Sequence, residues 1–394
     1  MSRARPRIVL IAGEPSGDVL GARMMAALRR ATGEAIALEG VGGEQMMAEG
    51  LASRFPMSEL SHMGLVELLP HLPRLLRRIG ETAQWLRRSP PDLLVTIDAP
   101  GFCLRLARRL RGSGIPILHY VAPTVWAWKP GRAARIAKLC DHLLALLPFE
   151  PPYFTRHGLA CTYVGHPALE TMMGAADGPG FRQRHGIPAE APVICLLPGS
   201  RAFELRHLLP VFGAAIRRLA QHHEGLRVIL PTVGPVARAA TAAARDLGFP
   251  TTVVADPAAK RDAFAASDVA LAASGTVAVE LAIVGTPAVI AYRANPLSAA
   301  IAPRLIKVKY ASLVNLLLDR AATPELLQEN CRPEKLAEAL DRLLTDPALR
   351  AGQRAAYGEA LAKLAVEGRP SDRAAAVALA MIAHRQEGAA RGTT

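Results

Sequence analysis

Two acidic side chains and a serine lie in a glycine loop near the start of the chain, where nucleotide-binding loops ordinarily avoid acids. In "RIVLIAGEPSGDVLGARMMAALRR", residues 7 to 30, an apolar run precedes the loop and apolar residues at helical spacing follow it, which predicts a strand, a tight turn and a helix. Neither a three-glycine dinucleotide fingerprint nor the G-K-[ST] of a P-loop is present. Both acids, Glu14 and Asp18, and the serine, Ser16, are candidates to accept hydrogen bonds from sugar hydroxyls, with Glu14 and Ser16 predicted to be catalytic. The alternative is that Ser16 or Asp18 only caps the helix.

A further acid, Asp98, ends the apolar run "DLLVTID" and is followed by the chain-turning residues Pro100 and Gly101. A carboxylate at the end of a buried strand can deprotonate an acceptor hydroxyl as a general base. The alternative is a capping aspartate for a helix that starts near Gly101.

The second half of the chain carries two candidate phosphate-binding loops. "LLPGSRAFELRHLLPVF", residues 196 to 212, and "AASGTVAVELAIVG", residues 272 to 285, each place small polar residues between a strand and a helix. The first-turn amides of such helices, together with a guanidinium, suit an anion. The predicted UDP-sugar ligands in these loops are Gly199, Ser200, Arg201, Ser274, Gly275 and Thr276. The alternative for each loop is an ordinary capped helix.

Two further polar positions accompany these loops. Glu280 lies about one turn after Thr276, so its carboxylate is placed to bind ribose hydroxyls. In "KYASLVNLLLDR", residues 309 to 320, Ser312 and Asn315 interrupt an apolar run. They are either a cap and a core amide or contacts to the diphosphate or uracil.

Aromatic and basic residues follow another predicted strand. Trp126, Trp128, Lys129 and Arg132 lie in "YVAPTVWAWKPGRAARI", residues 120 to 136, which indicates a sugar-stacking surface or simple packing. Among the scattered histidines, His166 in "VGHP" is the candidate to line a cleft, with a core or turn role as the alternative.

The segment from 63 to 88 combines an apolar stripe with a strong positive bias. The stripe and the arginines nominated as a membrane and acyl-chain port are Leu65, Leu68, Leu69, Leu72, Leu75, Leu76, Arg74, Arg77 and Arg78. By pattern alone a core-facing stripe is favoured; the alternative is an interfacial element that holds anionic headgroups.

Composition limits the class of protein. A chain of 394 residues is long enough for two domains, and 51% hydrophobic with 5% aromatic residues fits a packed α/β protein. The net charge of +13 predicts an anionic partner, namely nucleic acid, a nucleotide or an acidic membrane surface. The 5 cysteines show no CxxC spacing, so a reduced cytoplasmic protein without a structural zinc site is expected. No targeting segment or spanning helix is expected, and any membrane contact is predicted to be peripheral.

Apolar strand-like runs alternate with helical patterns throughout the chain, which predicts parallel sheets built from βαβ units. The composition between residues 172 and 192 reads as a linker, and a polar tail from Gln386 is predicted to be disordered. We therefore expect an N-terminal acceptor- and membrane-facing domain over 1–175, a UDP-sugar-binding domain over 190–345, and C-terminal helices over 346–394 that pack back on the first domain. Ligands of such sheets sit at the carboxyl ends of the strands, which predicts a cleft between the domains.

Together these motifs resemble a known family. "AGEPSGDVLGA", "APTVWAWKPGR", "LLPGSRAFE", "ASGTVAVELAIVGTPAVIAYR" and "SLVNLLLDR" with "PELLQENC" resemble the lipid-A-disaccharide synthases over roughly residues 7 to 345. Pro15 and Val314 stand where the family carries alanine and proline. The resemblance implies the GT-B architecture, two doubly wound Rossmann-like domains facing across a cleft.

The resemblance also implies an activity. This is inverting transfer of 2,3-diacylglucosamine from UDP-2,3-diacylglucosamine to 2,3-diacylglucosamine 1-phosphate (lipid X), which forms the β-1,6-linked disaccharide 1-phosphate of lipid A and UDP. Asp98 is then the expected base, with Glu14 and Ser16 orienting a sugar. The family context implies Gram-negative lipopolysaccharide biosynthesis at the cytoplasmic surface of the inner membrane. No metal site is expected because the sequence has neither HExxH nor a D-x-D pair, and neither a cofactor nor nucleic acid is predicted as a partner. The resemblance also allows a homodimer. With the family in view, a membrane port becomes the favoured interpretation of the apolar stripe at 63–79, in place of a core-facing surface.

Two competing functions remain at this point. The nearer is another GT-B enzyme acting on a UDP-N-acetylglucosamine-type substrate, such as an epimerase or a peptidoglycan transferase; the apolar and basic 63–88 segment argues against a wholly soluble substrate. The more distant is a non-enzymatic basic protein that binds nucleic acid or a membrane. The paired phosphate loops and the isolated acids argue against it.

Overall fold

The computed structural model describes residues 5–60, 72–127, 131–232, 234–293 and 308–391. The chain divides into two compact units, Met1–Pro167 with Val366–Thr394 and Ala168–Ala365. Each unit is an α/β structure around one parallel sheet of six strands. The two-domain α/β class expected from the alternating pattern is confirmed.

The first unit has the strand order β2-β1-β3-β4-β5-β6, with every neighbouring pair parallel. Residues 8–11 of the opening strand are fully buried because helices cover both faces of the sheet, which explains the continuous apolar run. The strands are β1 (Arg7–Ala12), β2 (Ala37–Val41), β3 (Leu93–Ile97), β4 (Ile117–Tyr120), β5 (His142–Ala145) and β6 (Ala160–Tyr163).

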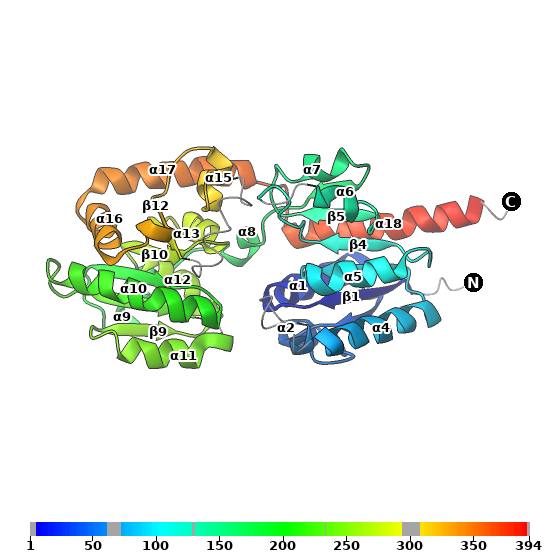
Figure 1. Ribbon diagram of the computed structural model, residues 1–394, viewed down its shortest axis with the longest axis horizontal. Helices are drawn as coiled ribbons and strands as arrows, with labels where there is room; N and C mark the ends of the chain where they lie inside the picture. Colours follow the sequence, from blue (N-terminus) through cyan, green and yellow to red (C-terminus); the bar gives the residue numbers. More distant parts are fainter. Residues whose placement is uncertain (1–4, 61–71, 128–130, 233, 294–307, 392–394) are drawn as a thin grey trace. The chain divides into compact units, whose positions relative to one another are not determined.

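Two hydrophobic clusters lie on opposite faces of this sheet, one under α4 and α5 and the other under α1 and α18. The last helix, red in Figure 1, packs beside the blue α1 through the buried small residues Ala374, Ala375 and Ala378. The helices of this unit are α1 (Pro15–Thr32), α2 (Glu44–Ala48), the 3-10 helix η1 (Met57–Glu59), α4 (Leu72–Arg88), α5 (Pro100–Leu110), α6 (Arg132–Ile136), α7 (Pro151–Thr155) and α18 (Pro370–Arg391).

The second unit repeats the design with the order β12-β11-β10-β7-β8-β9, again all parallel. Its strands are β7 (Val193–Leu197), β8 (Arg227–Pro231), β9 (Thr251–Val254), β10 (Val269–Ala273), β11 (Ala288–Tyr292) and β12 (Glu325–Leu327). Its helices are α8 (Ala168–Thr171), α9 (Gly178–Arg184), α10 (Ala202–Ala220), α11 (Gly234–Arg245), η3 (Pro257–Ala259), α12 (Lys260–Ala265), α13 (Val277–Val284), α15 (Leu313–Leu318), η4 (Gln328–Asn330), α16 (Pro333–Thr345) and α17 (Pro347–Leu364). The short β12 is a strand that the apolar pattern did not indicate.

The C-terminal helices divide between the units, whereas the sequence placed them together on the first domain. Helix α17 belongs to the second unit, where it packs on α13 and where Gln353 pairs with both backbone groups of Ala288. Helix α18 belongs to the first unit, where Arg30 pairs with Asp372. The predicted disordered tail also differs from the structure, because α18 continues to Arg391 and the tail residues before that point, apart from Gly388, favour helix.

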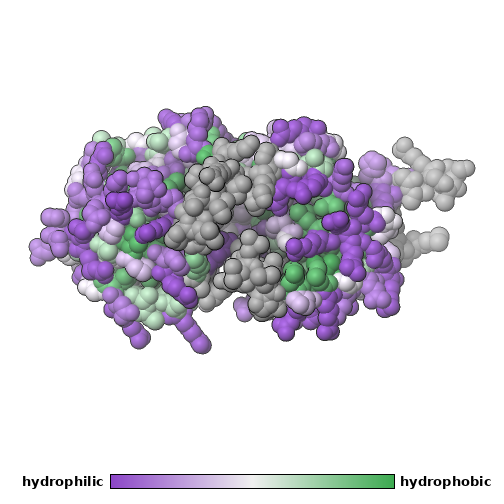
Figure 2. Space-filling model, viewed as in Figure 1, coloured by the Kyte–Doolittle hydropathy of each residue, from purple (hydrophilic) through white to green (hydrophobic). Residues whose placement is uncertain are grey.

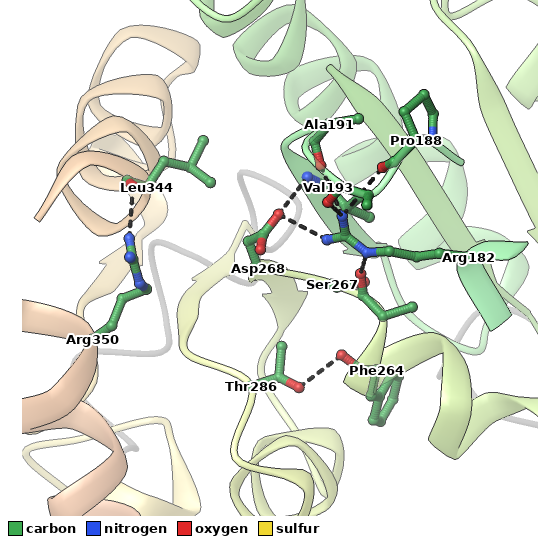
Figure 3. Close-up of polar contacts among 12 residues, drawn as sticks. Arg182, Pro188, Ala191, Val193, Phe264, Ser267, Asp268, Thr286, Leu344 and Arg350 are labelled. Carbon is green, nitrogen blue, oxygen red and sulfur yellow. Dashed lines mark hydrogen bonds and ion pairs between the residues drawn. The ribbon is translucent and has the colours of Figure 1, made fainter. Parts of the chain in front are cut away.

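The composition shift at 172–192 is not a linker. The residues from 168 onward belong to the second unit, and α9 packs its buried Phe181 against the core there. The guanidinium of Arg182 donates to the carbonyl oxygens of Ala266, Ala189 and Ala191 at 2.8, 2.7 and 3.0 Å. Figure 3 shows this guanidinium between Ala191 and Asp268. The same side chain pairs with Asp268, whose carboxylate accepts the Val193 amide at 2.8 Å. These contacts join the amino ends of β7 and β10, away from the phosphate loops.

Replacement of Arg182 by methionine is expected to lower the free energy of unfolding by about 2–4 kcal/mol, because several partly buried carbonyl groups and one carboxylate lose their partner. Arg184→Met is the matched control, since that side chain is 55% exposed on the same helix and its pairs are worth little. Urea unfolding of both variants measures the difference. Equal midpoints for the two would contradict the structural role of Arg182.

On the face seen in Figure 2, the described surface is mostly hydrophilic, with smaller apolar patches on both units. Within the described ranges, none of the helices combines the length and the hydropathy that a membrane crossing requires.

Candidate active site

In the first unit, the acidic loop and Asp98 lie at the switch point of the sheet. The chain leaves β1 toward β2 on one side and returns through β3 on the other side of β1. Ligands of doubly wound sheets bind at the carboxyl ends of the strands where the order reverses in this way. Glu14 and Ser16 follow β1 and Asp98 follows β3, so the topology brings together the three residues predicted from sequence to be catalytic.

Asp98 is held in a strained backbone at this edge. Its φ is +51° and that of the next residue, Ala99, is +42°, in the left-handed region that residues with a Cβ rarely adopt. The amide of Asp98 donates to the carbonyl oxygen of Tyr120 at 2.9 Å, and the Ser16 hydroxyl donates to the Asp98 carboxylate at 3.4 Å. Ala99, not Asp98, occupies the N-cap position of α5. The carboxylate is partly exposed, as a general base must be.

Glu14 lies close to the same point. It is the N-cap residue of α1 with extended backbone, and its side chain does not cap that helix. Burial raises the pKa of the Cys103 thiol, and the charges of Asp98 and then Glu14 raise it further. Glu14 follows β1 and Asp98 follows its parallel neighbour β3, so both acids lie at the carboxyl edge of the sheet.

Asp18, the other acid of the opening loop, serves the structure and not a ligand. Its carboxylate is buried and accepts the amides of Gly43, Gln45 and Met46 at 2.8, 2.9 and 3.0 Å. It therefore caps α2 and not its own helix. The expectation that all acids of this loop meet sugar hydroxyls is corrected: Asp18 is fully engaged by backbone amides.

In the second unit, the two predicted phosphate loops also flank a switch point. The chain runs from β7 outward to β8 and β9 and returns through β10 on the other side of β7. Residues 198–201 follow β7 and residues 274–276 follow β10, so the loops are neighbours at one sheet edge. Ser200, Arg201, Gly275 and Thr276 are exposed there, as a ligand site requires.

Glu204 closes the first loop. Its carboxylate accepts the amides of Ser200 and Arg201 at 3.0 and 3.3 Å, and its other oxygen lies 3.4 Å from the Arg201 guanidinium. Gly199 adopts φ +115°, and a Cβ there would meet the Glu204 carboxylate at 2.2 Å. The glycine is thus required both by the backbone and by the close approach of Glu204.

Gly199→Ala is expected to weaken UDP binding about tenfold or more, since the added methyl displaces Glu204 and strains the loop by about 1–3 kcal/mol. Gly186→Ala is the matched control: its φ is also positive, +61°, but a Cβ there meets nothing within 4 Å. Calorimetric titration of UDP into both variants gives the comparison. Unaltered UDP affinity in folded Gly199→Ala would argue against this loop as the diphosphate site.

The second loop has its own supports. The Ser274 hydroxyl donates to the carbonyl oxygen of Ala311 at 2.9 Å, so it fixes the loop against the segment before α15. Glu280 lies one turn into α13 and pairs with Lys260 at 2.5 Å. A ribose bound at Glu280 would share that carboxylate with Lys260.

Asn315 has a different place from the one predicted. It is fully buried, its amide donates to Thr323 and Glu325 at 2.8 and 2.7 Å, and its oxygen accepts the amides of Ala322 and Thr323. All of its hydrogen-bonding groups are therefore used within the protein. Glu325 in turn accepts the amides of residues 311 and 312, so Asn315 supports the segment that Ser274 contacts. Asn315 is therefore a core amide, and its predicted role as a direct ligand of UDP is corrected.

The tryptophan segment is only partly described. Trp128 and Lys129 lie outside the described residues, while Arg132 begins α6 and is half-buried. Trp126 packs edge-to-face on Phe149 and donates its indole N–H to Glu150 at 3.0 Å. Of the two alternatives, a sugar-stacking surface and simple packing, the structure therefore shows packing for Trp126.

His166 is 1% exposed, and burial lowers its pKa to about 4, so it is a neutral core histidine.

The predicted membrane port divides into inner and outer residues. Leu75 is 3% exposed and packs in the core of the first unit, because helix α4 turns it inward with Ile79; its assignment to the port is corrected. Leu76 is 49% exposed, Leu72 is half-buried, and Leu65, Leu68 and Leu69 lie outside the described residues. A surface pocket of about 310 Å³ is lined by Glu59, Arg74, Arg77 and Arg78.

Three side chains near the phosphate loops were not predicted from the sequence as site residues. These are Glu204, Lys260 and Tyr292, the last residue of β11, whose pKa is raised by burial and by the charge of Glu204. A glutamate three residues into a helix is a recognised start signal, so Glu204 was within reach of sequence analysis. Lys260 and Tyr292 carry no such local signal.

No group of three histidine, cysteine, aspartate or glutamate side chains among the described residues is arranged to hold a metal ion.

Solved structures share this architecture at low sequence identity. S. aureus MnaA, in a co-structure with UDP, matches with a TM-score of 0.62 at 13% identity over 91% of this chain and 94% of its own. A UDP-GlcNAc 2-epimerase from Neisseria meningitidis matches with a TM-score of 0.60, also at 13% identity, over 91% and 99%. At this identity the likeness establishes the fold alone.

Sequence relatives are much closer. A lipid-A-disaccharide synthase of Rhodospirillum centenum is 54% identical over 88% of this chain and 87% of the relative. One of Paramagnetospirillum magneticum is 50% identical over 96% and 98%. These identities do not favour the alternative of another enzyme for UDP-N-acetylglucosamine-type substrates. The family model described as "Lipid-A-disaccharide synthetase" matches residues 8–378, and the chain belongs to this family of glycosyltransferases.

Proposed function

We propose that the enzyme transfers 2,3-diacylglucosamine from its UDP conjugate to the 6-hydroxyl of 2,3-diacylglucosamine 1-phosphate, releasing UDP. Family membership supports the reaction. The observation that carries the mechanism is the partly exposed Asp98 carboxylate, bonded to Ser16 and held on a strained backbone at a sheet switch point.

The proposed step is a direct displacement with inversion. Asp98 takes the proton of the 6-hydroxyl as its oxygen attacks the anomeric carbon of the donor. The bond from that carbon to the UDP oxygen breaks, and UDP leaves with the electron pair. Glu14 and Ser16 orient the reacting sugar by accepting hydrogen bonds from its hydroxyls.

The second switch point is proposed to hold UDP. Arg201 and the amides of residues 274–276 neutralise the charge that develops on the diphosphate, while Glu280 binds the ribose. Ser200 adds its hydroxyl, which lies in the same exposed loop. Because Arg201 and the amides of residues 274–276 neutralise the charge in this assignment, we propose that turnover requires no metal ion or other cofactor.

UDP release from the acylated donor, measured with and without the sugar phosphate acceptor, tests this function. Release that depends on the acceptor and persists in a chelator is expected. Acceptor-independent release would indicate hydrolysis or epimerisation, and loss of turnover on chelation would contradict the metal-free mechanism.

We further propose peripheral attachment to the cytoplasmic surface of the inner membrane through the outer face of α4. Helix α4 exposes Leu76 together with Arg74 and Arg77, and the two arginines line the surface pocket. An apolar side chain among cations is typical of interfacial binding to anionic lipid.

Leu76→Ser combined with Arg74→Gln is expected to reduce sedimentation with vesicles of anionic phospholipid several-fold, because each basic residue near such a surface is worth about 1 kcal/mol. Met47→Ser combined with Arg206→Gln is the control, since Met47 is 48% exposed and both residues lie on other elements. Undiminished partitioning of the folded α4 variant would exclude these residues from the membrane contact.

A further inference from the structure

Glu150 is a buried carboxylate to which neither the family resemblance nor the mechanism above assigns a role. It is 2% exposed, and its oxygens accept the indole N–H of Trp126 at 3.0 Å and the amides of Leu146 and Leu147 at 3.0 and 2.9 Å. Burial raises its pKa to about 7 although these three bonds oppose the shift. Burial of an ionisable group is costly, and the three donors offset that cost here.

The carboxylate joins two loops at the carboxyl edge of the first sheet. Residues 146–150 follow β5, and residues 121–127, which contain Trp126, follow β4. The second of these loops starts under strain, because the β-branched Val121 has φ +80°. Its first two amides, from Val121 and Ala122, both donate to Leu144 at 3.1 Å. Such strain persists only where surrounding contacts determine the conformation, and the bond from Trp126 to Glu150 is one of those contacts.

The strained loop adjoins the candidate base. Tyr120, the residue before Val121, accepts the amide of Asp98 at 2.9 Å through its carbonyl oxygen. The positive φ angles of Asp98, Ala99 and Val121 thus lie at the ends of two neighbouring strands, β3 and β4. A continuous chain of contacts runs from Glu150 through Trp126 and the 121–127 loop to the backbone of Asp98.

We propose that Glu150 is a positioning residue for glycosyl transfer: with Trp126 it fixes the loop after β4 and, through Tyr120, the place of Asp98. This inference rests on the proposed function where it takes Asp98 as the base. Glu150 itself touches neither substrate, so its effect is on geometry, where a displacement of about 1 Å can cost on the order of 10²-fold in rate.

Glu150→Gln tests the link. An amide oxygen can keep the two backbone amides, but its NH₂ group then opposes the donor of Trp126. We expect kcat to fall about 10- to 100-fold with KM for the UDP-sugar nearly unchanged. Trp126→Phe keeps the ring against Phe149 and removes the donor, so the double variant is expected to lose no more than the worse single variant. Should Glu150→Gln fail to fold, Trp126→Phe alone decides, and wild-type kcat in it would overturn the proposal.

Asp141→Asn is the matched control, because Asp141 accepts the amide of Ile117 at 2.7 Å at the opposite, amino-terminal edge of β4 and β5. It should cost stability and leave kcat unaltered. Hydrogen exchange of residues 121–127 should quicken in Glu150→Gln and not in Asp141→Asn, whatever reaction the enzyme catalyses.

The Asp98→Ala background separates the two proposals. If Glu150 acts through Asp98, Glu150→Gln adds no further loss there. A folded Glu150→Gln enzyme with wild-type kcat overturns the positioning role while the base assignment stands. Undiminished turnover in Asp98→Ala with a slow Glu150→Gln enzyme overturns the base assignment and the action through Asp98 together.

Discussion

Asp98→Ala is expected to lower the turnover of the acylated donor and acceptor by about 10²-fold or more, the range typical of a lost general base. The Asp98 carboxylate lies one residue beyond β3 and accepts a hydrogen bond from Ser16. Without it, Glu14 is the one carboxylate that the proposed mechanism still has at the ends of β1 and β3. UDP affinity should be unaffected, since the loops proposed for UDP belong to the other unit. Initial rates of UDP release and calorimetric titration of UDP measure both quantities.

Asp92→Ala is the control for this variant because Asp92 lies one residue before the same strand, at its amino end. There its carboxylate accepts the amide of Arg7 at 2.7 Å. We expect it to cost about 1 kcal/mol of stability, the worth of one hydrogen bond, and to leave turnover intact. Wild-type turnover in folded Asp98→Ala would remove Asp98 from the role of base.

Local sequence signals predicted most of the fold. Buried parallel strands need apolar side chains on both faces, so runs such as residues 8–11 and 93–97 mark strands without knowledge of their neighbours. The loops after β1, β3, β7 and β10 were recognisable for the same reason, as glycine and small polar residues directly after such runs. Parallel pairing then places these loops at the carboxyl edges.

Side chains whose partners are distant in sequence could not be assigned in this way. Asp18 bonds Gly43 across 25 positions, and Arg182 bonds Asp268 across 86. Neither contact leaves a local pattern, so Asp18 resembled a sugar ligand and the segment of Arg182 resembled a linker. The prediction that Asn315 contacts UDP was wrong for a related reason. A polar residue in an apolar run is equally compatible with a ligand contact and with a core amide whose hydrogen bonds are all made within the protein.

Arg201→Gln is the second variant with a large expected effect, a reduction in kcat of about 10²-fold. Charge accumulates on the diphosphate as the glycosidic bond breaks, and a lost cation at such a place costs on the order of 10²–10³ in rate. The side chain is 55% exposed, and its partner Glu204 is engaged by the loop amides, so the guanidinium can turn toward a ligand. Glutamine keeps the length and a donor but removes the charge.

Arg218→Gln isolates that charge from general effects on α10. Arg218 lies on the same helix, is 54% exposed, and likewise pairs with a single glutamate, Glu334. Its loss should change neither kcat nor UDP affinity, because exposed pairs contribute little.

The ratio of the two measured effects of Arg201→Gln identifies what the arginine does. A group that binds UDP equally in the ground state and in the transition state changes KM without kcat, whereas a group that meets developing charge changes kcat more. We therefore expect the loss in kcat to exceed the loss in UDP affinity. If affinity falls and kcat holds, Arg201 is an anchor for UDP, and the charge of the leaving group must be met instead by the amides of residues 274–276.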